Sequence, residues 1–186
     1  ARWVEGAIAC RNYPPEYGFY AMRAGGTAHG PASADEVFRV VCAIGEDGDW
    51  YYANVLWWLR RAADWLVGGP SFRRTRRHPA ELRVGDVGDS WRVIALEPGR
   101  RLTLLMEMKA PGAGVQELVV KPNPDGSGSS VTATAYWHPA GVAGLAYWYS
   151  LVPAHLFIFR GLTRAIMRHA TAASGHSGSE SLRGPK

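Results

Sequence analysis

One stretch without charged residues constrains this chain more than any other feature. No Asp, Glu, Lys or Arg occurs from Gly126 to Phe159, and the part that reads GVAGLAYWYSLVPAHLFIF is almost entirely apolar and aromatic. About twenty such residues are enough to cross a bilayer. Pro153 and His155 interrupt the segment, however, and its aromatic residues lie near the middle, where a membrane span favours aliphatic side chains. We therefore expect an enclosed segment of a soluble protein and no transmembrane span.

Length and charge narrow the classes of protein that fit. A chain of 186 residues is long enough for one domain with one core. The net charge of +5 comes largely from arginines, which gather in residues 73–77 and again at Arg160, Arg164 and Arg168. A basic patch suits nucleic acid, phospholipid head groups or an anionic substrate. No nucleic-acid motif accompanies it, so we expect a solvated surface and no nucleic-acid partner.

The first third of the sequence predicts a strand and two helices. The strand covers Tyr17 to Arg23, and the cluster Gly25, Gly26, Gly30 and Pro31 is expected to end it. Ser33 and Glu36 have the spacing of a capping box at the start of a short helix. A second helix is predicted over about 51–67. Its apolar face, which we expect to be buried, consists of Tyr52, Leu56, Leu59, Ala63 and Leu66.

The middle of the chain predicts an antiparallel meander. The extended runs cover residues 90–96, 101–109, 115–121 and 131–137, and turn sequences separate them. In the second run Leu104, Met106 and Met108 alternate with more polar residues, so one face should be buried. Glu107 then points to the other face, where we expect an ion pair with Arg92 or Lys109.

The last part predicts a helix that covers the sheet. It begins after His138 and Pro139 and runs to about Ala172, and Pro153 is expected to break or kink it. Residues 174–186 are rich in Ser and Gly and read as a disordered tail. We therefore predict an α+β protein: one domain over residues 1–173, with a curved antiparallel sheet wrapped around a long C-terminal helix.

Small side chains on the predicted inner surfaces suggest a cavity. Ala133 and Ala135 on the last strand, and Ala143, Gly144 and Ala146 on the helix, leave space that a flat hydrophobic ligand fills. A packed aromatic core without a ligand explains the same pattern equally well. The residues expected to line the site are Tyr52, Trp57, Trp91, Leu104, Met106, Met108, Trp137, Trp148 and Tyr149.

Longer segments of the chain resemble a known domain. These are WYYANVLWWLR, ELRVGD, DSWRVIALEPGRRLTLLMEMKAPG and TATAYWHPAGVAGLAYWYSLVPAHLFIFRGLTRAI. They resemble an uncharacterised bacterial domain that often follows a short-chain-dehydrogenase-like domain, and that is similar to the START, or polyketide cyclase, helix-grip superfamily. The resemblance implies a helix-grip fold, and an NAD(P)-binding dehydrogenase-type domain as a partner. The chain itself has no G-x-G-x-x-G motif, so we predict no cofactor.

The sequence lacks the motifs of several classes of enzyme, and acid-base chemistry is the reaction class that remains. No two histidines have the helical spacing of metal ligands, so we predict no metal site. The sequence also has no nucleophile elbow, which argues against a serine hydrolase of that type. His138, His155 and Tyr147 are the candidates for proton transfer, and desolvation should keep His155 neutral. In purely structural roles, His138 caps the helix and His155 makes one hydrogen bond in the core.

Three functions follow from these observations. The leading hypothesis is a cytoplasmic domain that binds a hydrophobic, aromatic or polyketide-like small molecule. The first alternative is a cofactor-independent cyclase, dehydratase or isomerase that acts on such a ligand. The second alternative is a module that docks on a dehydrogenase-type domain through its aromatic helix.

Overall fold

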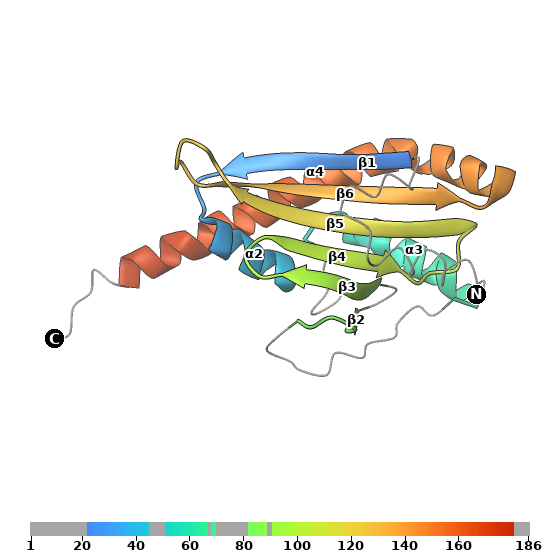
Figure 1. Ribbon diagram of the computed structural model, residues 1–186, viewed down its shortest axis with the longest axis horizontal. Coiled ribbons are helices and arrows are strands. Elements are labelled where there is room, and N and C mark those ends of the chain that lie inside the picture. Colours follow the sequence, from blue (N-terminus) through green and yellow to red (C-terminus); the bar gives the residue numbers. More distant parts are fainter. Residues whose placement is uncertain (1–21, 45–50, 67, 70–81, 89–90, 181–186) are drawn as a thin grey trace.

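An antiparallel sheet of six strands faces one long helix in the computed structural model of the protein (Figure 1). The structure describes residues 22–44, 51–66, 68–69, 82–88 and 91–180. The strand order is β1-β6-β5-β4-β3-β2. The strands are β1 Met22–Gly30, β2 Val87–Gly88, β3 Trp91–Glu97, β4 Arg101–Met106, β5 Gly112–Pro122 and β6 Ser129–Pro139. The helices are α2 Ala34–Cys42, α3 Asn54–Leu66 and α4 Gly141–Glu180.

The meander predicted from the alternating pattern is confirmed. Strands β3 to β6 follow one another along the chain and pair with their sequence neighbours. The expected ion pair is present, with Arg92 Nε 2.5 Å from Glu107 Oε1. The structure adds the two-residue strand β2, which the sequence did not indicate. Strand β6 also runs past Trp137 to Pro139, so His138 belongs to the sheet and not to the start of the helix.

One face of the sheet carries the core. Because side chains alternate along a strand, the paired residues Leu104, Gln116, Ala135 and Ala24 all project from the same face. This inner face meets α4 and α2. The fully buried side chains in this layer include Leu102, Leu118, Val120, Val131, Leu162 and Ile166.

The prediction that the first strand ends at Arg23, before Gly25 and Gly26, is wrong, because the strand ends at Gly30, before Pro31. Strand β1 begins at Met22 and contains Gly25, Gly26 and Gly30. A Cβ atom on Gly26 would lie 2.9 Å from the backbone nitrogen of Arg160, so the strand meets the backbone of α4 directly. These glycines therefore allow close packing and do not form a turn. The rest of the predicted strand, residues 17–21, lies outside the described residues.

Helix α2 begins as predicted. Ser33 is its N-cap, and the side chains of Ser33 and Glu36 form the reciprocal bonds of a capping box. Val37 and Val41 are fully buried, and the helix packs against α4 and the sheet. The capping box fixes the start of the helix, so that its apolar stripe meets the core.

The prediction that α3 buries its apolar face is wrong. Leu56, Leu59 and Leu66 are 40%, 51% and 75% exposed. Apolar neighbours such as Val55, Trp58 and Trp65 are exposed as well. Two polar side chains face the sheet instead. Arg60 Nη1 lies 2.9 Å from Met108 Sδ, and the Asp64 carboxylate accepts a hydrogen bond from the Lys109 backbone N–H at 2.8 Å. Periodicity identified the apolar stripe of this helix but not the direction in which it points.

Pro153 was expected to break or kink the last helix, and it does not break α4. The helix is continuous from Gly141 to Glu180, beyond the expected end near Ala172. Within the described residues it is long and apolar enough to cross a membrane, by length and composition alone. Its later half nevertheless packs against β1 and β6 with Leu162 and Ile166 fully buried, so α4 is the central helix of the fold.

Candidate functional site

Three aromatic side chains meet where β6 ends and α4 begins. The ring centroid of Trp137 lies 5.3 Å from that of Tyr147 and 6.4 Å from that of Trp148, and the two indoles are nearly parallel. Trp137 Nε1 donates a hydrogen bond to the Gly144 carbonyl at 3.2 Å. Strand and helix thus hold a rigid aromatic surface on the inner side of the sheet, as expected for Trp137, Tyr147 and Trp148.

His155 continues this aromatic group along α4. Its ring centroid lies 4.8 Å from that of Trp148 and 5.7 Å from that of Phe159. The Nδ1 atom is buried and has no hydrogen-bond partner in the part of the chain that the structure describes. Burial lowers the pKa of His155 below its usual 6.5, so the imidazole is neutral at physiological pH. This is the charge state that the sequence predicted.

Gln116 is a second buried polar group on the same side of the sheet. The side chain projects from β5 between Leu104 and Ala135, and the residue is 1% exposed. Neither Oε1 nor Nε2 has a partner among the described residues. Ala135 and Ala24 follow it across the neighbouring strands, so small side chains border the amide. The sequence analysis missed Gln116, although a polar residue at an inward position of the strand was a visible signal.

Tyr147 lies at the side of the aromatic group that faces α3. Burial raises the pKa of its hydroxyl; the positive charge of Arg60 opposes this rise, and the negative charge of Asp64 adds a smaller rise. Both of these residues come from α3 and also contact the chain at the end of β4. The hydroxyl therefore stays protonated at neutral pH and is available as a hydrogen-bond donor.

Several other predicted residues share the inner layer with this group. Trp91, Leu104 and Met106 are buried, and Met108 packs against them. Trp91 pairs with Met106 across β3 and β4. Gly114 makes room for the larger side chains, since a Cβ atom there would lie 3.3 Å from both Met106 Sδ and the Trp137 ring.

The structure does not bring the remaining predicted residues to this place. Tyr149 is 65% exposed, and the ring of Tyr52 packs against that of Phe157 in a tilted arrangement, with ring centroids 5.2 Å apart. His138 follows Trp137 in β6, so alternation directs it to the outer face, away from His155. Trp57 belongs to α3, but its side chain lies outside the described residues.

A buried carboxylate that the sequence analysis did not single out lies on the outer face. Glu117 is 7% exposed, and its Oε2 lies 3.5 Å from Arg101 Nη1. Burial raises the pKa of Glu117, although Arg101 opposes this effect. The sheet separates this group from the aromatic cluster, so it plays no part in the candidate site. Among the described residues, no group of three His, Cys, Asp or Glu side chains could hold a metal ion.

The antiparallel sheet and the long C-terminal helix place the protein in the helix-grip fold class. The family model described as "Protein of unknown function (DUF2867)" matches residues 22–162, and the chain belongs to this family. No protein with a curated description matches the chain.

Some solved structures with low sequence identity are similar to this chain. A protein from Nitrosospira multiformis is 14% identical with a TM-score of 0.51, and the match covers 82% of this chain and 99% of that one. The protein Ara h 8.0201 is 14% identical with a TM-score of 0.47, over 81% of this chain and 98% of that one. The di-domain ARO/CYC protein BexL of the BE-7585A biosynthetic pathway is 14% identical with a TM-score of 0.46, over 80% and 50%.

Proposed function

We propose that the protein binds a flat, hydrophobic small molecule of aromatic or polyketide-like type between the inner face of the sheet and α4. The observation that carries this proposal is a pair of buried polar groups without partners, the Gln116 amide and His155 Nδ1. They lie on the side of the sheet that holds the aromatic cluster. In a core with a purely structural role, buried polar groups are normally either hydrogen-bonded or replaced by apolar groups.

The energetics favour a ligand that combines rings with a few polar atoms. A buried polar group without a partner costs about 1–3 kcal/mol, and a ligand that hydrogen-bonds to it offsets this cost. Trp137 and Trp148 offer nearly parallel ring faces for stacking. The side chains of Ala24 and Ala135 are short and leave room above the sheet beside Gln116, where a planar molecule could lie.

Native mass spectrometry of the purified chain tests the proposal directly. We expect a small molecule to co-purify, and quenching of tryptophan fluorescence by a hydroxyanthraquinone to give saturable binding. Gln116→Leu and His155→Phe should each weaken that binding about tenfold, since each removes one buried hydrogen bond. Thr134→Val, on the outer face, is the control and should bind like the wild type. If no molecule co-purifies and both inner variants bind the probe unchanged, the proposal is wrong.

Acid-base catalysis on the bound molecule is the second candidate, and the state of His155 supports it. A neutral imidazole with an unpartnered nitrogen in desolvated surroundings is suited to take a proton from a ligand carbon and return it to oxygen. Cyclisation or dehydration of this kind needs no cofactor. Incubation of the co-purified molecule with wild type and His155→Gln distinguishes the two functions. Conversion by the wild type alone supports catalysis, whereas an unchanged molecule in both samples leaves binding as the function.

A further inference from the structure

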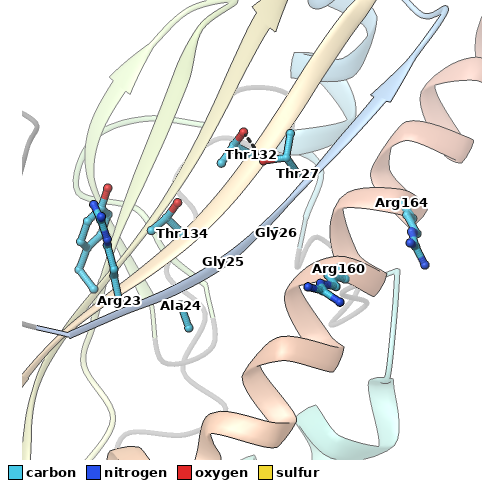
Figure 2. A pocket seen from close by; sticks show the side chains of 10 residues that line it. Arg23, Ala24, Gly25, Gly26, Thr27, Thr132, Thr134, Arg160 and Arg164 are labelled. Carbon is cyan, nitrogen blue, oxygen red and sulfur yellow. Dashed lines mark hydrogen bonds between the residues drawn. The ribbon is translucent and has the colours of Figure 1, made fainter.

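A basic groove lies at the β1 edge of the described sheet. It has a volume of about 640 Å³ and extends around β1, from α4 on one side to the outer face of the sheet on the other (Figure 2). Arg23 and Thr27 line it from β1, Thr132 and Thr134 from β6, and Arg160 and Arg164 from α4. Figure 2 shows the two α4 arginines on one side of the glycine-containing strand and Arg23 on the other.

The packing of β1 on α4 fixes this groove. Gly26 brings the strand against the backbone of Arg160, where any side chain would collide. The helix arginines therefore emerge directly beside the strand edge. On the β6 side, a hydrogen bond of 2.9 Å between Thr27 Oγ1 and Thr132 Oγ1 links the two strands. The groove thus has walls of regular secondary structure and does not depend on a loop.

Among the residues that the structure describes, the lining of the groove contains arginines and threonines but no Asp or Glu. Arg92, Arg100 and Arg101 do form ion pairs with carboxylates, and they lie on or beside β3 and β4, away from β1. A neighbouring groove of about 710 Å³ shares Arg164 and adds Arg168 and His29, again without a carboxylate. Arg160, Arg164 and Arg168 are spaced four residues apart and so form one basic row on α4.

We infer that this groove binds the phosphate group of an anionic ligand. Arginine guanidinium groups present paired N–H donors that match the oxygens of phosphate, and threonine hydroxyls add further donors. A ligand with one carboxylate would engage a single arginine, whereas a phosphate has enough oxygens for several. The site is separate from the aromatic cluster, so it adds a second ligand to the one proposed above.

The phosphate could belong to a soluble molecule or to a lipid head group. The exposed apolar residues of α4 favour the lipid head group. Val142, Tyr149 and Leu156 are 82%, 65% and 47% exposed. Their helical spacing places them on the same face as Arg160 and Arg164. An exposed apolar stripe that continues into a basic row suits a membrane surface with anionic lipids.

Binding of glycerol phosphate and of vesicles tests the inference with the full chain. Titration calorimetry measures glycerol phosphate, and co-sedimentation compares phosphatidylcholine vesicles with vesicles that also contain phosphatidylglycerol. The test variant is Arg160→Ala/Arg164→Ala, and the control is Arg39→Ala/Arg100→Ala, which removes the same charge from exposed positions elsewhere. We expect the test variant to lose at least about tenfold in affinity, because charged hydrogen bonds are lost, and the control to bind like the wild type.

The outcomes separate the two sources. Saturable binding of glycerol phosphate that only the test variant loses identifies a soluble phosphate ligand. Binding to anionic vesicles alone, lost in the test variant and also in Val142→Ser/Tyr149→Ser, identifies a lipid head group. If the wild type binds neither probe, or if test and control variants lose binding equally, the inference is overturned. Circular dichroism of each variant shows whether the fold is intact.

Discussion

At the scale of the residue, Gln116 links the stability of the protein to its proposed ligand. A fully buried amide without a partner raises the free energy of the folded state. Gln116→Leu should therefore increase the free energy of unfolding of the ligand-free protein by about 1 kcal/mol, because leucine has a similar volume and needs no hydrogen bond. Urea denaturation measures this change. A loss of stability would show that the amide is satisfied in the folded protein.

The pKa of His155 predicts how stability depends on pH. Burial lowers the pKa of the folded state, so the unfolded chain binds the proton more readily once the pH falls to about 6.5. The free energy of unfolding should then decrease as the pH falls below that value. Phenylalanine cannot take up a proton. As the pH falls, the free energy of unfolding of the wild type should therefore decrease more than that of His155→Phe. Urea denaturation at a series of pH values measures the difference, and a constant difference would contradict the prediction.

At the scale of the element, the glycines of β1 determine how closely strand and helix pack. A methyl group at Gly26 would meet the backbone of Phe159 and Arg160 at 2.9 Å, and a backbone cannot move aside as a flexible side chain does. We expect Gly26→Ala to destabilise the protein by about 1–3 kcal/mol. Gly88→Ala in β2 is the control, since a Cβ atom there has nothing within 4 Å. Equal effects of the two substitutions on the urea midpoint would show that β1 and α4 can separate without cost.

The same elements show where periodicity was informative and where it was not. Alternation in the meander revealed the strands and the outward position of Glu107, because both depend on local backbone geometry. The role of Gly26 depends on α4, which is remote in the sequence, so local rules interpreted the glycine as a turn. Pro153 was expected to break or kink the last helix, yet α4 is continuous through it, and the later half of α4 packs on the sheet.

At the scale of the whole molecule, the fold was predictable and the candidate site only in part. The order of strands and helices along the chain was enough to predict the helix-grip arrangement. Sequence also predicted that Trp137, Tyr147, Trp148 and His155 come together, since the end of β6 leads directly into α4. It did not predict the exposure of Tyr149, because a helix in which apolar residues occur all round gives no signal of its orientation.

The loose attachment of α3 predicts a motion that exposes the site. This helix packs against the described strands and helices far less than α2 or α4 does, and its tethers at Arg60 and Asp64 lie beside Tyr147. We expect the amides of α3 to exchange with deuterium well before those of β5, by a local opening that leaves the sheet folded.

Removal of one tether should isolate that motion. Asp64→Ala deletes the carboxylate that accepts the Lys109 N–H, so exchange in α3 should become faster while exchange in β5 and the urea midpoint change little. Hydrogen exchange read by mass spectrometry follows both elements in one experiment, and Asp35→Ala, at an exposed position of α2, provides a control for the loss of an acidic side chain. If Asp64→Ala accelerates exchange in β5 as much as in α3, the helix opens only when the whole protein unfolds. It then cannot open locally to expose the aromatic site. A co-purified ligand in the aromatic site should slow exchange in α3, because opening would expose it.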